Sequence, residues 1–244
     1  MLFNDYNDQM MNNLFKKESF NNIYDKNKNG NVLLTGTTTL SIRCKDGVVF
    51  GTDRRATAGY YVASKHAKKT HKINQSAAMT IAGVVADAQA LIDILRIECN
   101  LYNLKHEHPI SVLATARLLS NILFERRWFP YYTQLLIGGY DNTGARVFSM
   151  DPVGSLIEEK TISATGSGTT YAIAVLEDGY HEGITIKEAI PMAIHAVRTS
   201  IERDIGSGNG IDITVIDKNG YNELSNPEIE KELEKIGKKI KSFT

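Results

Sequence analysis

The sequence has few of the features that mark secreted or membrane-spanning proteins. Only two of its 244 residues are cysteines, Cys44 and Cys99, and neither belongs to a Cys-x-x-Cys motif. Two such cysteines cannot build a disulfide framework, so we expect buried thiols in a reducing cytoplasm. No apolar run approaches the ~18–20 residues that a transmembrane helix needs. Asn4 and Asp5 interrupt the N-terminus before the apolar segment of a signal peptide can form.

The chain also lacks a net charge, because 28 Lys and Arg residues balance 28 Asp and Glu residues. A neutral chain has no global field that would hold nucleic acid or an anionic membrane, so we expect neither as a partner. A net charge near zero instead favours association between protein chains. The length suits one large domain or two small ones, and 42% hydrophobic residues suffice for a well-buried core.

Several common catalytic and binding motifs are missing. There is no Gly-x-Ser-x-Gly turn, no His-Glu-x-x-His zinc motif and no Gly-x-x-x-x-Gly-Lys phosphate loop. His106 and His108 have no second ligand pair at zinc spacing, so we expect them to be solvated. The segments Gly166-Ser167-Gly168 and Gly206-Ser207-Gly208 could hold phosphate, or could be tight turns that bring the backbone close to another segment. We expect no metal and no cofactor.

Residues 1–36 differ from the rest of the chain, because they are rich in Asn and Lys and show no sustained periodicity. Asn favours turns and local hydrogen bonds over helix. We therefore expect residues 1–36 to form a leader and residues 37–244 to form a single domain. An ordinary frayed terminus would have the same composition.

Strand and helix patterns alternate through the predicted domain. Alternating or apolar runs predict strands at 38–44, 48–53, 72–73, 78–82, 133–137, 146–150, 155–162 and 211–216. Helical spacing predicts helices near 91–104, 112–123, 169–176 and 185–201, and a tail helix from about Pro227. In the first helix, one face carries Leu91, Ile94, Ile97, Leu101 and Leu104. Thr185 and Glu188 form a capping box, and Pro191 either kinks that helix or marks its start. Blocks of strands between helix pairs predict an α+β fold with helices stacked on sheets.

The segment Gly36-Thr37-Thr38-Thr39 stands at the junction between leader and domain. A threonine hydroxyl is a poor nucleophile until a base removes its proton. If the Gly36–Thr37 bond is cut, Thr37 gains an α-amine whose reference pKa of about 7.7–8.0 suits such a base. Gly36 suits the cut because it adds no side chain to the strained turn that self-attack requires. Alternatively, the three threonines open an edge strand, and the spacing alone favours this interpretation.

A series of motifs runs in order from about Thr35 to about Ile216, namely TGTTTLSIRCKDGVVFGTDRRAT, KHAKKTHKI, AAMTIAGVVADAQ, TQLLIGGYD, SATGSGT and ERDIGSGNGIDITVI. Together these motifs resemble the proteasome β subunit of the archaeal type. The resemblance implies the four-layer αββα sandwich of the N-terminal-nucleophile hydrolases. It implies autocatalytic removal of residues 1–36 and a cytoplasmic threonine endopeptidase that degrades unfolded proteins. The implied partners are β subunits in heptameric rings, rings of α subunits, and an unfolding ATPase that acts through the α ring.

The resemblance also gives roles to individual residues. The matched positions are Thr37, Asp53, Lys69, Gly83, Ser167, Asp204 and Ser207. Thr37 matches the nucleophile, and the Lys69 ammonium would lower the pKa of its α-amine. Asp53 would hold Lys69 protonated by a charge-assisted bond. The backbone N–H of Gly83 would stabilise the oxyanion. Ser167, Asp204 and Ser207 would lie near the threonine amine, which the last two would help to orient.

Five further positions match the walls of the pocket for the residue before the scissile bond, namely Ala56, Ala67, His71, Ile81 and Val85. Small and aliphatic walls without a carboxylate favour apolar over basic side chains, and protonated His71 would widen that choice. The leader is longer than is common in archaeal members. Every expected catalytic position is filled, which favours an active subunit over a structural one that only builds the ring. A small-molecule amidase with the same kind of nucleophile is a more distant alternative.

Overall fold

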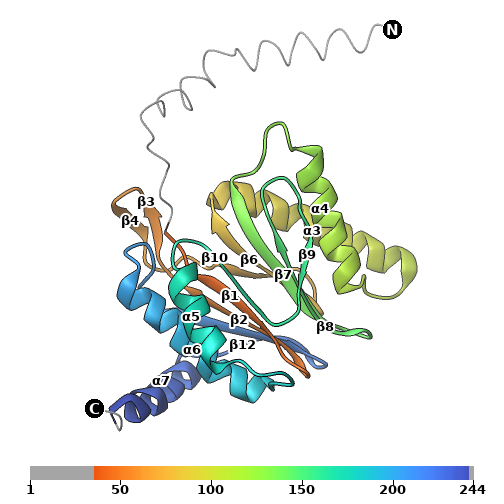
Figure 1. Ribbon diagram of the computed structural model, residues 1–244. Helices are drawn as coiled ribbons and strands as arrows, with labels where there is room; N and C mark the ends of the chain where they lie inside the picture. Colours follow the sequence, from red (N-terminus) through yellow and green to blue (C-terminus); the bar gives the residue numbers. More distant parts are fainter. Residues whose placement is uncertain (1–35, 242–244) are drawn as a thin grey trace, which may run out of the picture. The chain divides into compact units, whose positions relative to one another are not determined.

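The computed structural model describes residues 36–241, so the predicted leader lies outside the described residues apart from Gly36. The described residues form two five-stranded antiparallel sheets and a separate two-stranded hairpin (Figure 1). The first sheet, in the order β10-β1-β2-β11-β12, contains β1 (Thr39–Arg43), β2 (Gly47–Asp53), β10 (Ile162–Thr165), β11 (Ile211–Asp217) and β12 (Gly220–Glu223). The second sheet, in the order β5-β6-β7-β8-β9, contains β5 (Thr70–Lys72), β6 (Ala77–Gly83), β7 (Thr133–Asp141), β8 (Gly144–Met150) and β9 (Ile157–Glu159). The hairpin consists of β3 (Ala56–Ala58) and β4 (Tyr61–Ser64).

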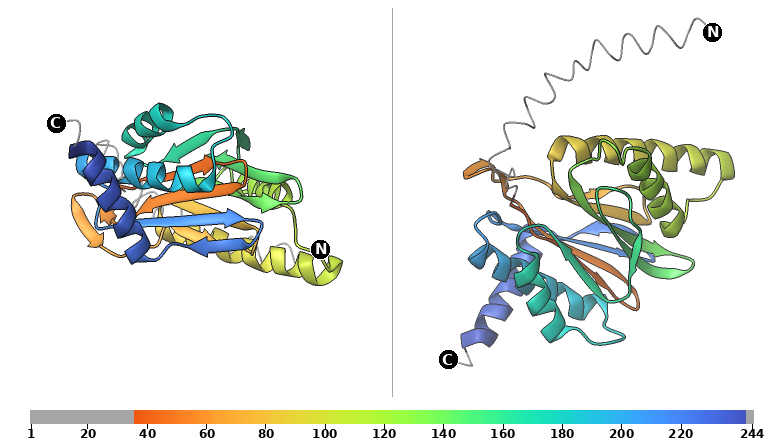
Figure 2. Two further views of the ribbon diagram at one scale, coloured as in Figure 1. Left: turned by 90° about the horizontal axis from the view of Figure 1, so that it is seen from below. Right: turned by 45° about the horizontal axis from the view of Figure 1, so that its top comes forward.

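Helices cover the outer faces of both sheets. The helices are α3 (Val85–His106), α4 (Val112–Glu125), α5 (Thr169–Gly179), α6 (Ile186–Arg203) and α7 (Asn226–Lys241). Figure 2 shows α5 and α6 beside the first sheet and α3 and α4 beside the second, with the two sheets between the helix pairs. The α+β prediction and the four-layer αββα arrangement are thereby confirmed.

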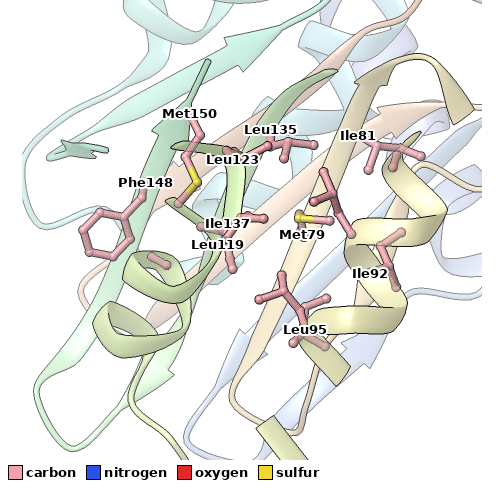
Figure 3. Close-up of a cluster of buried hydrophobic side chains, with 14 of the residues drawn as sticks. Met79, Ile81, Ile92, Leu95, Leu119, Leu123, Leu135, Ile137, Phe148 and Met150 are labelled. Carbon is pink, nitrogen blue, oxygen red and sulfur yellow. The ribbon is translucent and has the colours of Figure 1, made fainter. Parts of the chain in front are cut away.

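Three apolar clusters hold the layers together. Leu119, Leu135 and Phe148 belong to the cluster between the second sheet and α3 with α4 (Figure 3). A second cluster joins the first sheet to α5, α6 and α7, and a third, which includes Phe50 and Leu136, joins the two sheets. A fully buried side chain of this size contributes about 1.5–3 kcal/mol by leaving water. The sheets therefore form a rigid support for the residues at their ends.

Strand β1 positions the predicted nucleophile. Its residues Leu40 and Ile42 are fully buried in the cluster against α5 and α6, as the alternation of the sequence predicts. On the other face, Thr39 Oγ1 accepts a hydrogen bond from Thr80 Oγ1 of the second sheet at 3.2 Å. One face of β1 packs against α5 and α6 and the other contacts the second sheet, so the strand is fixed between the two layers. Thr37 lies two residues before the start of this strand.

The local helix patterns are confirmed. Thr185 Oγ1 accepts from the backbone of Glu188 and the Glu188 carboxylate accepts from Thr185, so the capping box is formed. Pro191 does not mark the start of α6, because that helix begins at Ile186 and continues through the proline. The tail helix begins at Asn226, next to Pro227. In the described residues, no helix is long and apolar enough to cross a membrane.

Two predictions are wrong. The run 155–162 is not one strand, because β9 pairs with β8 in the second sheet whereas β10 pairs with β1 in the first. The predicted apolar face of α3 is not the buried one. Leu91 is fully buried, but Ile97 and Leu104 are 58% and 79% exposed, because the helix packs against the second sheet through Leu95 and Cys99 instead. The hairpin β3–β4 and strand β12 were not predicted, since each of these strands has only three or four residues and none of these residues is buried.

Candidate active site

Gly36 and Thr37 are both buried, and hydrogen bonds fix the junction between them. Thr37 is only 5% exposed, and its hydroxyl donates to the carbonyl oxygen of Gly36 at 2.6 Å. Its backbone N–H donates to Ser167 Oγ at 3.0 Å, and its carbonyl accepts from the N–H of Gly168 at 3.2 Å. The hydroxyl therefore lies beside the peptide bond that is predicted to be cut.

Both Gly-Ser-Gly segments are tight turns against this junction. Gly166 has φ +98°, and a Cβ atom there would lie 2.2 Å from the carbonyl oxygen of Thr37. Gly36 and Gly206 meet backbone to backbone, since a Cβ atom on Gly36 would lie 1.9 Å from Gly206 Cα. Of the two interpretations of these segments, the structure supports close backbone approach.

A buried ion pair lies next to Thr37. Asp53, the last residue of β2, is fully buried, and its Oδ1 accepts from Lys69 Nζ at 2.6 Å and from the Thr38 N–H at 2.8 Å. Its Oδ2 accepts from the N–H groups of Gly208 and Arg55 at 2.9 and 3.0 Å. Each carboxylate oxygen thus has two donors, which offset the desolvation of the charge.

Lys69 is the cation of this pair and is 4% exposed. Burial lowers the pKa of its ammonium group below the ordinary value of 10.5, and the Asp53 charge and hydrogen bond oppose that shift without cancelling it. Lys69 therefore gives up its proton more readily than an exposed lysine. This qualifies the expectation that Asp53 keeps it protonated.

The residues expected near the threonine amine form a second chain of hydrogen bonds. Ser167 accepts from the Thr37 N–H and donates to Asp204 Oδ2 at 2.6 Å. Ser207 also donates to Asp204 Oδ2 at 2.6 Å, and its hydroxyl shares a 2.7 Å hydrogen bond with Thr38 Oγ1. Ser167 is thus the direct partner of the Thr37 nitrogen, whereas Asp204 reaches that nitrogen through Ser167 and Ser207 contacts Thr38.

Gly83 ends β6, in register with Thr133 of β7. Two residues earlier, the N–H of Ile81 donates to the carbonyl of Lys69 at 2.9 Å. This hydrogen bond fixes β6 beside the lysine, so Gly83 lies at the same end of the second sheet as the ion pair.

The five predicted pocket residues come from segments around Lys69. Ala56 lies on β3, Ala67 precedes β5, His71 lies on β5, Ile81 lies on β6, and Val85 begins α3. Ile81 is buried, whereas Val85 is 48% exposed. Burial lowers the pKa of His71 below its ordinary value of 6.5, so a proton on this residue requires acidic conditions.

Sequence reasoning missed two residues of this region. The Arg55 guanidinium donates to Asn209 Oδ1 and to the Ile205 carbonyl, both at 2.8 Å, and so joins the end of β2 to the turn after α6. Thr57 Oγ1 accepts from the N–H of Gly36 at 2.7 Å. The TDRR motif could have indicated Arg55, but no local pattern links Thr57 to Gly36.

Comparison with known proteins agrees with this geometry. The family described as Proteasome subunit matches residues 33–216. The "Proteasome subunit beta" of Ferroglobus placidus is 50% identical over 201 residues, which cover 82% of this chain and 96% of that protein. The protein of the same name from Methanocaldococcus fervens is 48% identical over 213 residues, or 87% of this chain and 95% of its own. In Archaeoglobus profundus the identity is 47% over 201 residues, with coverages of 82% and 94%. With similarity over most of both chains and an αββα sandwich, the chain belongs to the proteasome subunit family, as a β subunit of the archaeal type.

Proposed function

We propose that this chain is the catalytic β subunit of a proteasome core, a threonine endopeptidase whose nucleophile is Thr37 after removal of residues 1–36. The observation that carries the proposal is the set of hydrogen bonds around the junction, which connects Thr37 to Ser167 and Thr38 to Asp53 and Lys69. A buried ion pair is costly to desolvate and contributes little net stability. Its place beside the buried Thr37 hydroxyl indicates that it serves chemistry.

Leader removal needs a base other than the α-amine, because the nitrogen of Thr37 is still part of an amide. Lys69 suits this role because burial lowers its pKa. The Asp53 oxygen that accepts from Lys69 also accepts from the N–H of Thr38, the residue after Thr37. The Thr37 oxygen would bond to the Gly36 carbonyl carbon, the carbon–nitrogen bond would break, and the nitrogen would take the proton. Water then cleaves the ester and leaves a Gly36 carboxylate and a free Thr37 amine. A donor such as the Gly83 N–H contributes about 3–4 kcal/mol to stabilising the oxyanion.

After leader removal, the freed amine can itself act as the base. The Ser167 hydroxyl already bonds this nitrogen and is fixed by Asp204, so the amine would keep its orientation. A charged Lys69 nearby disfavours a second positive charge and lowers the amine pKa. Substrates would present apolar side chains to the pocket around Ile81 and Val85. His71 favours the same choice because it stays neutral near pH 7.

We further propose that the chain works inside a larger particle. The relatives are named as proteasome subunits, which supports heptameric β rings, flanking α rings, and an unfolding ATPase that delivers unfolded polypeptides in the cytoplasm. The exposed apolar side chains Ile97, Leu101 and Leu104 on α3 are consistent with a surface that another subunit covers.

Intact mass after assembly with an α partner tests the proposal. The wild-type chain should begin at Thr37 and hydrolyse fluorogenic peptides with apolar residues before the cut. Thr37→Ala should keep residues 1–36 and show no turnover, whereas the control Thr37→Ser, which retains a hydroxyl, should still be processed. A wild-type chain that keeps its leader and lacks activity would support the structural subunit instead. Cleavage of Thr37→Ala at the wild-type rate would overturn the nucleophile assignment.

A further inference from the structure

We propose that the Thr57 hydroxyl is a positioning group for removal of the leader, an inference that rests on the proposed self-cleavage at Thr37. Thr57 lies on β3, 21 residues from Gly36 in the sequence, and its Oγ1 accepts from the Gly36 N–H at 2.7 Å. Gly36 is the last residue of the proposed leader. Thr57 therefore binds the leader side of the scissile bond, whereas Ser167 binds the Thr37 side.

The two sides of the bond need separate anchors. On the Thr37 side, the N–H and carbonyl of Thr37 are fixed by Ser167 and Gly168. On the other side stands a glycine, which has more backbone freedom than any other residue and no side chain to hold. A hydrogen bond from its N–H to Thr57 fixes the peptide unit that precedes the scissile carbonyl.

Close packing completes this arrangement. Gly36 lies against Gly206 so closely that a Cβ atom on either would overlap the other backbone, at 1.9 or 2.2 Å from its Cα. The Thr57 hydroxyl and the Gly206 backbone thus both confine Gly36. Confinement of a reacting group near its attack geometry accelerates an intramolecular step.

The step that Thr57 would assist is the first one. The Thr37 oxygen bonds to the Gly36 carbonyl carbon, the Gly36–Thr37 carbon–nitrogen bond breaks, and the hydroxyl proton ends on the Thr37 nitrogen. Thr57 exchanges no proton in this step. It keeps the carbonyl turned toward the hydroxyl, which in the structure donates to the oxygen of the same carbonyl. Once the leader leaves, this contact of Thr57 is lost with it.

The test is a time course of leader removal, followed by intact mass after full-length chain is mixed with its α partner. Thr57→Val keeps the branched shape and removes the acceptor, and Thr57→Ser keeps the acceptor. Loss of one such hydrogen bond corresponds to about a 3- to 10-fold slower rate. We expect that slowing for Thr57→Val and a rate within about 2-fold of wild type for Thr57→Ser. Ser64→Ala, on the partner strand β4 of the same hairpin, is the matched control and should process normally.

The outcomes separate this inference from the function on which it rests. If the wild type loses its leader and Thr57→Val does so at the same rate, only the role of Thr57 is wrong. A Thr57→Ser rate as slow as that of Thr57→Val would also overturn it, because a merely structural role would not be restored by the hydroxyl. If Thr57→Val fails to assemble, Thr57→Ala is compared with Thr57→Ser under the same criteria. A wild-type chain that never loses its leader would overturn the proposed function together with this inference.

Discussion

Replacement of Asp53 by asparagine should destabilise the fold as well as stop the chemistry. In the wild-type chain, one carboxylate oxygen accepts from Lys69 and Thr38, and the other accepts from Gly208 and Arg55. Asparagine has nearly the same shape but offers an acceptor on one side only. Its NH₂ group would face two N–H donors on the other side, whichever way the amide turns.

The structure sets the size of the effect. Removal of one member of a buried ion pair costs about 3–5 kcal/mol, because the remaining charge stays without its partner. Asparagine retains one oxygen, which satisfies two of the donors, and Lys69 can lose its proton because burial already lowers its pKa. We therefore expect Asp53→Asn to reduce the free energy of unfolding by about 3 kcal/mol, the lower end of that range.

Urea unfolding of the full-length chain measures this change. The measurement should be made in a Thr37→Ala background, so that all variants keep the same length. Glu202→Gln is the control, because its pair with Arg198 leaves the two side chains 57% and 37% exposed and should contribute no more than about 1 kcal/mol. The reasoning is refuted if Asp53→Asn loses no more stability than this control.

Four further predictions concern Lys69, Glu158 and Gly36. Lys69→Ala should abolish both leader removal and peptidase activity, and either reaction at the wild-type rate in this variant would contradict its role. Because the folded-state pKa of Lys69 lies below 10.5, the stability of the Thr37→Ala chain should rise with pH between that lowered value and 10.5, and Lys69→Met should remove this rise in urea titrations. Hydrogen bonds from Arg146 lower the pKa of Glu158 from 4.5 to about 2. Its contribution to stability is therefore complete above pH 4.5 and is lost as the pH falls toward 2. Glu158→Gln should reduce the fall of the free energy of unfolding over this pH range, measured by urea titrations. Gly36→Ala should slow leader removal at least about 10-fold, because its Cβ atom would lie 1.9 Å from a backbone atom, and wild-type processing measured by intact mass would show that the junction adapts.

The parts of the fold that depend on residues close together in the sequence could be predicted from it. The capping box of Thr185 and Glu188 and the helix after Pro227 are local patterns, and both are present. The alternation of Leu40 and Ile42 correctly indicated a buried face. The hairpin at 56–64 was not predicted because its strands are only three and four residues long and contain no buried residue, so they give no usable hydrophobic period. Helix α3 is apolar on more than one face, so periodicity did not show that Leu95 and Cys99 are buried whereas Ile97 and Leu104 are exposed.

The candidate site could not be assembled from spacing alone. Ser167 is 130 residues from Thr37, and the two meet because β1 and β10 pair as neighbours in the first sheet. Lys69 reaches Asp53 from a different segment, so neither residue stands out in the sequence. The order of motifs indicated these residues by resemblance. It did not indicate Thr57, whose contact with Gly36 depends on how the β3–β4 hairpin lies against the junction.

The N-terminal residue of the assembled, active particle tests the central claim most directly. N-terminal sequencing together with intact mass should give Thr37 as the first residue of every active β chain. An active particle in which residues 1–36 remain covalently attached to Thr37 would contradict the account, because its nucleophile would then have no free amine.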